Sequence, residues 1–343
     1  MAAIQAVVIR FLGHVLSLEF LEGGQVNNLL RLIGRRLIAL PIMVIGVTIL
    51  VFFVMSLSPI DEAQSSLGVD ATQSDLIEYR ESHGLNDPAV VRYFRYMGNL
   101  IQGNFGTYGA SQTSVGDFIA SALPITLELT FAGVILGLIF AVIFGIISAI
   151  YRDKWPDKVL RVVSIICIST PSFWLAVLMI LLFSSTLGWL QASGELPGFF
   201  DDPGGWIARM AMPSIAIAVP LAGQMTRVIR TSVVEELDKD YVRTALGAGI
   251  PKSVVVGKNV LRNALISPVT VLGLKIAHAM GGAVVVEVIF NLRGMGMAIY
   301  QAISANYMDL AQGVVLVVAF AFIIINIIVD MLYILIDPRI RAV

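Results

Sequence analysis

The sequence predicts an all-α membrane protein with six transmembrane helices and both termini in the cytoplasm. Three observations lead to this fold class. Apolar residues make up 57% of the 343 residues and charged residues only 14%, whereas about a quarter of a typical soluble domain is charged. The apolar residues form several runs of about 20 residues, the length that a helix needs to cross a bilayer. The basic residues lie mainly in alternate connections between these runs.

The apolar runs set the positions of the six spans. All but one of these runs lack charged side chains, and the exception contains Lys275, His278 and Glu287. The spans are predicted at residues 37–60, 129–151, 162–194, 210–226, 263–290 and 310–329.

The ionisable residues of the fifth span are expected to have a function, because burying a charge in hydrocarbon is costly. Lys275 and His278 are three residues apart and share one face of a helix, and Glu287 lies nearer the outer end. One interpretation places Lys275, His278 and Glu287 on a water-filled pathway. The other pairs Lys275 with a carboxylate such as Glu128, or with backbone carbonyls of a neighbouring helix.

The basic residues set the orientation, because short cytoplasmic connections carry an excess of Lys and Arg. They precede the first span, separate the second from the third and the fourth from the fifth, and follow the sixth: Arg31, Arg35, Arg36, Arg152, Lys154, Lys158, Arg161, Arg227, Arg230, Lys239, Arg243, Lys252, Lys258, Arg262, Arg339 and Arg341. Residues 188–209 instead hold one basic residue against three acidic ones. Both termini and the long basic loop are therefore predicted to face the cytoplasm.

The first 30 residues form a separate N-terminal extension. Arg10 interrupts an apolar stretch at residues 4–20, whereas a signal peptide has its basic residues ahead of the apolar run. We therefore predict an amphipathic helix at the membrane interface for residues 1–30, with a weak additional span as the alternative. Residues 31–60 then contain the first transmembrane helix.

Residues 61–118 are predicted to form an external cap segment of mixed composition. A short helix is expected over residues 71–82, with Thr72 as its N-cap, and a second helix over residues 86–97. The cap is too small to be an independent enzyme domain, so it either seals the outer face or binds an external protein. The core domain, residues 119–341, contains the other five spans.

The cytoplasmic loop at residues 231–262 is the most informative part of the chain. Its central string is DYVRTALGAGIPK, in which helix-compatible residues give way to a turn. Gly249 permits a backbone conformation that a residue with a Cβ resists, and Pro251 suits the first turn of a following helix. A helix, turn and helix lying on the membrane face can carry force into the spans on either side.

Several functions are excluded by what the sequence lacks. The string GAGIPKS is not a phosphate-binding loop, because Pro251 lacks the amide hydrogen that would wrap the phosphate. No nucleophile and base pair, and no metal-ligand spacing, is present among the residues. A net charge of −1 gives no electrostatic basis for nucleic-acid binding. The chain is therefore not expected to be an enzyme or to bind a cofactor.

The sequence resembles the permease subunits of ABC importers, in particular the dipeptide and oligopeptide branch. The matching strings are DYVRTA and GIP in the loop, LRNALISPVTVLGL at residues 261–274, GGAVVVEVIF at residues 281–290 and NIIVDMLYILIDPRIR at residues 326–341. The resemblance covers residues 29–341. It implies a type I ABC importer permease fold and a multi-pass protein of the bacterial inner membrane.

The resemblance also implies a transport mechanism and a set of partners. An external solute-binding protein would deliver peptide to this subunit and a homologous second permease, with a heterodimer favoured. Two cytoplasmic ATP-binding subunits, or one fused ATPase, would bind ATP and Mg²⁺ and drive alternating access. Membrane lipid would surround the spans.

The residues that dock the ATPase subunit are implied by the same resemblance. The family's Glu-Ala-Ala signature falls on Arg243, Thr244 and Ala245, and its glycine falls on Gly249. The residues expected to form or shape the docking surface are Asp240, Tyr241, Arg243, Thr244, Ala245, Gly249 and Pro251.

Two alternative functions stay open at this point. Permeases of the same branch that transport nickel or glutathione would share these features. An ion-coupled secondary transporter would need ion-binding carboxylates within the spans, for which Glu287 is the one candidate.

Overall fold

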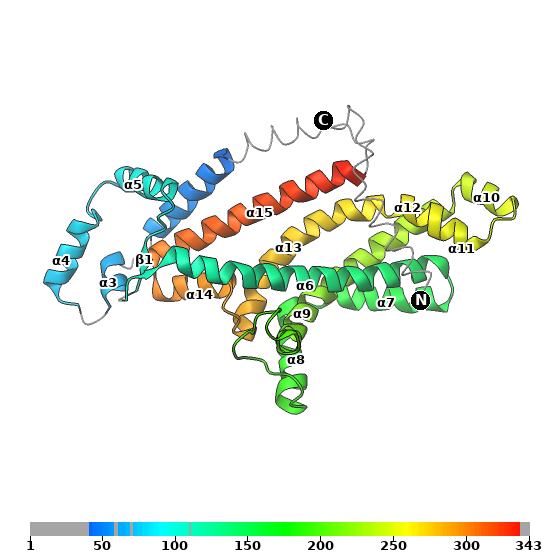
Figure 1. Cartoon of the computed structure of the whole chain (residues 1–343), viewed down its shortest axis with the longest axis horizontal. Helices are drawn as coiled ribbons and strands as arrows, with labels where there is room; N and C mark the ends of the chain where they lie inside the picture. The colour runs from blue at the N-terminus through cyan, green and yellow to red at the C-terminus, as the bar shows by residue number, and fades with distance from the viewer. Residues whose placement is uncertain (1–40, 58–60, 69–70, 110, 337–343) are drawn as a thin grey trace.

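The structure is a computed structural model that describes residues 41–57, 61–68, 71–109 and 111–336. Its long helices run roughly along the longest axis of the molecule, with short helices at both ends (Figure 1). The N-terminal extension at residues 1–30, for which an interfacial helix is predicted, lies outside the described residues. The chain segment that ends at residue 341 is described only as far as residue 336.

Within the described residues, four helices are long and apolar enough to cross a membrane. They are α6 (Val115–Ile150), α9 (Pro203–Leu237), α13 (Ile266–Phe290) and α15 (Met308–Ile336). They account for four of the predicted spans: those at residues 210–226 and 310–329 lie wholly inside α9 and α15, and those at residues 129–151 and 263–290 extend one residue beyond the end of α6 and three residues ahead of α13. The first predicted span contains a shorter apolar helix at Pro41–Ser56, which begins at the first described residue.

The third predicted span, residues 162–194, differs from the structure. Two helices replace it, α7 (Trp155–Ser169) and α8 (Ser172–Met179). The π-helical stretch η2 (Ile180–Thr186) continues α8, and the two parts are bent by 95°. Pro171 explains the break, because it has no amide hydrogen and forces the residue before it out of the helical region. Thr170 has φ −88° and ψ 112°, which is extended backbone.

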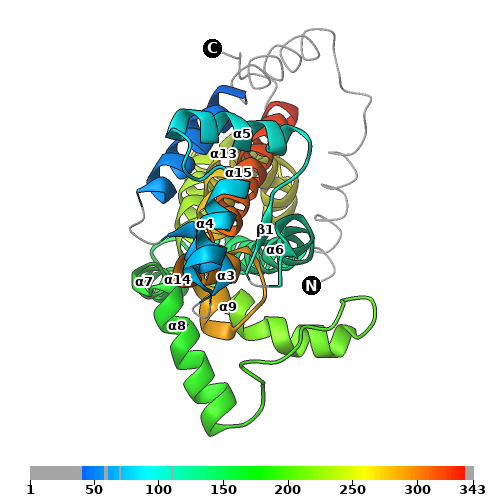
Figure 2. The same ribbon diagram turned by 90° about the vertical axis from the view of Figure 1, so that its left-hand side faces the viewer.

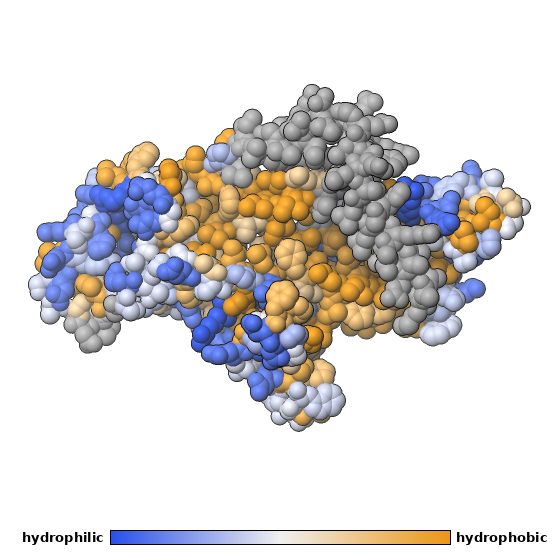
Figure 3. Space-filling model, in the orientation of Figure 1, coloured by the Kyte–Doolittle hydropathy of each residue, from blue (hydrophilic) through white to orange (hydrophobic). Residues whose placement is uncertain are grey.

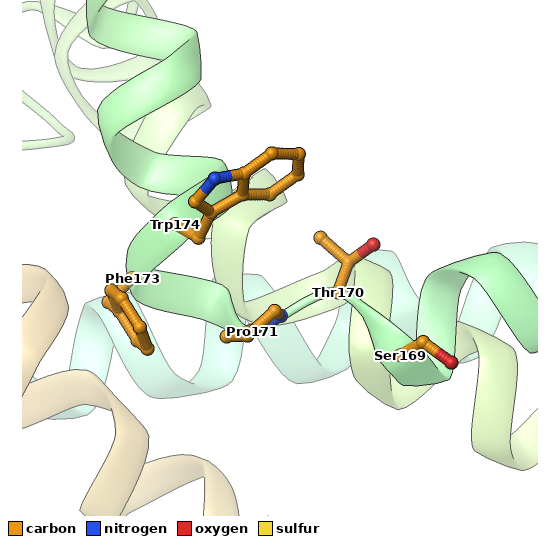
Figure 4. Close-up of a pocket in the computed structure, with 5 residues that line it drawn as sticks. All are labelled: Ser169, Thr170, Pro171, Phe173 and Trp174. Atoms are coloured by element: carbon orange, nitrogen blue, oxygen red, sulfur yellow. The ribbon is translucent and has the colours of Figure 1, made fainter.

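The bend leaves a shallow hollow lined by Ser169, Thr170, Pro171, Phe173 and Trp174. Figure 4 shows these side chains on both arms of the bend. Beyond the bend, α8 leaves the bundle and projects to one side in both ribbon views (Figures 1 and 2).

The cap contains three helices and a small hairpin at one end of the molecule. They are α3 (Glu62–Leu67), α4 (Gln73–Ser82), α5 (Ala89–Ile101), and the strands β1 (Thr107–Tyr108) and β2 (Thr113–Ser114), which pair antiparallel. The prediction of Thr72 as an N-cap is confirmed, since its side chain and that of Asp75 form a capping box. Helix α5 extends beyond the expected end at residue 97. Neither α3 nor the hairpin was predicted from the sequence.

Helix α6 begins earlier than the apolar run that predicted it. The Ser114 side chain caps it by accepting a hydrogen bond from the Asp117 amide at 3.3 Å. Its first turns bury Val115 and Ile119 in a small core with α14 (Met295–Ala305) and α15. The expected boundary between cap and core, at residues 118 and 119, therefore falls inside α6.

The main core lies between α6 and α9, which pack closely because α6 presents small residues to α9. Gly133, Gly137, Ala141 and Gly145 recur every four residues along α6. A Cβ at Gly137 would lie 2.9 Å from the Ala218 carbonyl oxygen of α9. Such a stripe of small residues lets two membrane helices approach until their backbones touch.

The end of the molecule opposite the cap carries the predicted cytoplasmic loop. The first part of this loop, residues 231–237, continues α9. The rest contains α10 (Asp240–Gly247), α11 (Lys252–Val254), the π-helical stretch η3 (Val255–Val260) and the beginning of α12 (Leu261–Ala264). Figure 3 shows hydrophobic residues over much of the middle of the molecule, with a hydrophilic patch at its lower edge near α8. Hydrophilic residues also cover the cap and lie, with some hydrophobic ones, around α10. The molecule therefore has an apolar band between two polar ends.

Candidate functional site

Helix α10 and the turn after it form a compact elbow at this second polar end. The Gly249 amide donates to the Leu246 carbonyl at 3.0 Å, and the Ile250 amide donates to the Ala245 carbonyl at 3.2 Å. This pair of bonds around a left-handed residue is a Schellman motif. Gly249 has φ +80°, as its predicted role in the turn requires. Pro251 then occupies the N-cap of α11.

The predicted docking residues divide between two faces of the elbow. Asp240, Arg243, Thr244, Gly249 and Pro251 are exposed to solvent. Tyr241 and Ala245 are half-buried and pack on the main core. The structure thus keeps the seven residues in one elbow, and five of them lie on its outer face.

Three apolar residues on the outer face were missed by the sequence analysis. Leu246, Ile250 and Val254 are 41%, 43% and 39% exposed. They stand at the tip of an otherwise polar loop, around the Gly249 turn. Their apolar character at a solvent-facing turn was the signal that could have found them.

The inner face of α10 is fastened by Glu236, near the end of α9. Glu236 is 6% exposed and accepts hydrogen bonds from the Tyr241 hydroxyl at 2.8 Å and the Asn263 side-chain amide at 3.1 Å. Lys239 forms an ion pair with it at 2.6 Å. Burial raises the pKa of Tyr241, and the bond to Glu236 raises it further as a smaller cause. Tyr241 therefore stays a neutral donor. No sequence signal linked Glu236 to Asn263, which lies 27 residues away.

A second polar cluster joins α6, α7 and α9 one to two turns before Glu236. Asp157 is fully buried and receives the Arg230 guanidinium, at 2.7 Å to Oδ1 and 2.8 Å to Oδ2. The Ser148 hydroxyl donates to Oδ1 at 2.5 Å and the Asp153 amide donates to Oδ2 at 2.9 Å. These bonds fix the turn between α6 and α7 against α9.

Glu287, one of the predicted pathway residues, lies inside the subunit. Its side chain is fully buried and accepts bonds from the Thr126 hydroxyl at 2.6 Å and the Gly296 amide at 2.7 Å. Thr126 in turn accepts from the Met295 amide at 2.8 Å. Glu287 and Thr126 together satisfy the first amides of α14, which has no side-chain cap of its own.

The other two pathway residues have a different environment from that of Glu287. Lys275 is half-buried and His278 is exposed, with the His278 Nδ1 2.7 Å from the Leu274 carbonyl oxygen. Lys275 forms no ion pair within the described residues. The alternative partner Glu128 instead accepts a bond from the Trp206 indole at 2.7 Å. The structure therefore keeps Lys275 and His278 on an accessible face of α13 and separates them from Glu287.

A buried arginine at the cap side of the core was also missed by the sequence analysis. Arg209 is 4% exposed, and its guanidinium donates to the carbonyl oxygens of Ala192 at 2.7 Å, Phe290 at 2.6 Å and Gly194 at 3.4 Å. It joins the connection before α9 to the C-terminal end of α13, where a positive charge is favourable.

Comparison with known proteins identifies the family. Residues 141–342 match the family described as binding-protein-dependent transport system inner membrane component. Residues 29–130 match the N-terminal part of such membrane components. Within the described residues, no group of three or more His, Cys, Asp or Glu side chains could hold a metal ion.

Three curated relatives cover most of the chain. A Brucella abortus protein, named as a peptide transport system permease protein, is 37% identical over 88% of this chain and 96% of its own length. The Escherichia coli protein named as the D,D-dipeptide transport system permease protein DdpB is 33% identical over 90% and 97%. The glutathione transport system permease protein GsiC of Salmonella paratyphi A is 35% identical over 91% and 99%.

A solved structure shares the fold. The MetNI methionine ABC transporter, in an inward-facing conformation, contains a chain that superposes with a TM-score of 0.53 and 15% sequence identity, covering 64% of this chain and 96% of that one. The apolar band, the helical core and the two sequence matches agree with one another. The protein therefore belongs to the family of inner-membrane components of binding-protein-dependent transport systems, as a permease of the ABC importer type.

Proposed function

We propose that this chain is a transmembrane permease subunit of an ATP-driven importer for peptides. Three relatives that align with this chain over nearly their whole length are named as permease proteins of peptide, D,D-dipeptide and glutathione transport systems. Six spans with both termini in the cytoplasm form the subunit, with the first span built around the apolar helix at Pro41–Ser56 and the third bent at Pro171. This arrangement places the cap outside the cell and α10 inside it.

The elbow around α10 is the observation that carries the proposal. Its inner face is held by buried contacts, while its outer face presents Arg243, Leu246 and Ile250 to solvent. A rigid surface feature of this kind suits a cleft on a soluble partner, with apolar side chains at the centre and a charge at the rim. We propose that Asp240, Arg243, Thr244, Gly249 and Pro251 form this surface, with Tyr241 and Ala245 shaping it from beneath.

The mechanism that we propose is alternating access. ATP binding closes the two cytoplasmic ATPase subunits, or one fused ATPase, and draws the α10 elbows of this subunit and its homologous partner together. Since each state has different contacts with nucleotide and with the external binding protein, ligands shift the population between an outward-facing and an inward-facing state. This chain provides the pathway and transmits the motion, while the ATPase subunits bind ATP and Mg²⁺.

Lys275 and His278 are proposed to line the pathway, because their side chains lie on an accessible face of α13. Glu287 is assigned a different part in this proposal, since its oxygens are already bonded to Thr126 and Gly296. It would shape the outer end of the pathway by holding α14.

A second candidate substrate is glutathione, itself a small peptide. The relatives named for glutathione transport match this chain nearly as well as those named for peptides. A ligand screen of the partner solute-binding protein with dipeptides, longer peptides, glutathione and Ni²⁺ separates these substrates. Binding of Ni²⁺ alone would contradict the peptide assignment.

Docking of the elbow is tested by Arg243→Glu and Ile250→Glu in the assembled transporter. Both changes place a carboxylate on the outer face, so we expect loss of substrate-stimulated ATP hydrolysis and of uptake in proteoliposomes. Lys154→Glu is the matched control, because Lys154 is exposed in the turn between α6 and α7. Intact complexes of the Arg243 and Ile250 variants with undiminished hydrolysis and uptake would remove the proposed role.

A further inference from the structure

The buried carboxylate of Glu236 connects three separate elements. Glu236 belongs to the last turn of α9, Tyr241 to the first turn of α10, and Asn263 to α12. The Asn263 amide nitrogen also lies 3.5 Å from the Tyr241 hydroxyl oxygen, so the three side chains close on one another. Lys239 also forms an ion pair with the Glu236 carboxylate, but the Lys239 side chain is 57% exposed to solvent.

The connectivity of the chain makes these bonds consequential. Only Asp238 and Lys239 separate α9 from α10, and only Leu265 separates α12 from α13. The covalent links alone would let α10 swing about the Gly249 turn and the short link after α9. The side-chain bonds through Glu236 oppose that swing, and the burial of Val242 beside them adds apolar contact.

We infer that Glu236, Tyr241 and Asn263 form a positioning node that makes α10 move as one body with α9 and α13. The inference rests on the proposed function, since it describes how a displacement of α10 reaches the spans. A displacement of α10 then moves α9 and α13 together with it. Without the node, α10 would move with the ATPase subunit, and α9 and α13 would move less than α10.

The strength of the node depends on burial. A hydrogen bond to a buried charged group contributes more than one at the surface, whereas an exposed ion pair such as that of Lys239 contributes little. Removal of one bond from Tyr241 or Asn263 is therefore expected to raise the proportion of α10 detached from Glu236 by about tenfold or more.

The test follows one distance inside this subunit. Spin labels are placed on Gly247→Cys in α10 and Leu274→Cys in α13. Gly247 is exposed, lies outside the proposed docking residues and has room for a Cβ, and the Leu274 side chain is 63% exposed. Cys167→Ser removes the single native cysteine. The label-to-label distance is measured in the complete transporter in lipid nanodiscs, without nucleotide and with ATP and vanadate.

With the node intact, we expect one narrow distance that is the same in both nucleotide states. Tyr241→Phe and Asn263→Leu should each add a second distance population that grows with nucleotide. Thr231→Ala is the control, because the exposed Thr231 hydroxyl donates to the Arg227 carbonyl of its own helix, and it should keep the single distance. The double variant Tyr241→Phe with Asn263→Leu should add less than the sum of the two.

Two results would contradict the inference that these three residues hold α10 to α9 and α13. One is a single narrow distance in Tyr241→Phe with and without nucleotide, and the other is a distance that changes in the protein with the node intact. Tyr241→Phe removes only one oxygen atom and should still assemble. It therefore tests the inference even if the Asn263→Leu variant does not assemble. The measurement needs no substrate, so failure of peptide uptake would contradict the proposed function and leave this result readable.

Discussion

At the scale of single residues, Gly249 has a conformation that other residues adopt only at a cost. Its φ of +80° closes the Schellman motif at the end of α10. Gly247, two residues earlier, is helical, and a Cβ added there would meet no atom within 4 Å. The two glycines of one short string therefore have opposite requirements.

This contrast predicts opposite effects of alanine at the two positions. Gly249→Ala should destabilise the elbow by about 1–2 kcal/mol, because a Cβ is unfavourable in the left-handed region. Gly247→Ala should stabilise α10 by about 0.5–1 kcal/mol, because alanine loses less backbone entropy in a helix. Hydrogen exchange of the α10 amides in the assembled transporter measures both, and equal protection in the two variants would contradict the assignment.

The Asp157 cluster gives a second prediction for single residues. Asp157→Asn should destabilise the subunit by about 3 kcal/mol, because it leaves the Arg230 guanidinium without its buried counter-charge. Arg152→Ala is the control: its ion pair with Asp238 at 2.8 Å is half exposed and should contribute about 0–1 kcal/mol. Thermal unfolding of the purified complex compares them. Similar melting temperatures for both variants would show that the cluster does not hold α7 to α9.

Local chemistry explains which residues could be predicted from the sequence. Thr72 and Gly249 act on backbone groups within a few positions of themselves, so their neighbours in the chain reveal their roles. Glu236 with Asn263, and Asp157 with Arg230, join residues 27 and 73 positions apart. Their pairing depends on how the helices pack, which no local pattern contains.

At the scale of elements, the small residues along α6 set the distance between α6 and α9. The stripe was present in the sequence as glycines and an alanine spaced four apart, but its partner was not. The Gly137 position shows the consequence most clearly, because a Cβ there would meet both a Leu221 methyl group and the Ala218 backbone oxygen of α9, and the backbone oxygen cannot rotate away.

Gly137→Ala is therefore expected to destabilise the subunit by about 1–3 kcal/mol, the usual cost of overpacking a close interface. Gly281→Ala in α13 makes the same chemical change where a Cβ meets nothing within 4 Å. Thermal unfolding in the same detergent should separate the two. Equal unfolding temperatures of Gly137→Ala and Gly281→Ala would contradict this prediction, because α9 would then have moved to accept the methyl group with no loss of stability.

Sequence patterns predicted which elements exist better than where they begin and end. Apolar runs located the long helices, because a bilayer requires a minimum apolar length. They missed the start of α6, whose first turns are covered by α14 and α15 and can therefore include polar residues. They also joined α7 and α8 into one span, although Pro171 breaks the helix between them.

At the scale of the whole molecule, the apolar band separates two polar ends of different construction. The cap consists of short helices held by ion pairs, such as Arg92 with Glu62 at 2.9 Å. The α10 end is a single elbow fastened to the spans. The proposed orientation places them on opposite sides of the membrane.

This arrangement predicts one-sided labelling. In the Cys167→Ser background and in membranes without the ATPase subunits, Leu246→Cys in α10 should react with a membrane-impermeant maleimide only from the cytoplasmic side. Ile77→Cys in α4, where the side chain is 51% exposed, should react only from the outer side. Intact cells and inside-out vesicles provide the two sides, and each variant serves as the control for the other. Labelling of Leu246→Cys in intact cells would invert the subunit and remove the proposed contact with ATPase subunits.

Arg209 has a consequence for how the sequence can diverge. Its guanidinium bonds to main-chain oxygens of Ala192, Gly194 and Phe290 rather than to side chains. Every amino acid supplies such an oxygen, so an exchange at Ala192 leaves its acceptor in place, whereas Gly194 has φ +129° and Phe290 is fully buried. A change of side chain at Ala192 therefore keeps this anchor of the connection ahead of α9, whereas a change of Arg209 removes all three bonds.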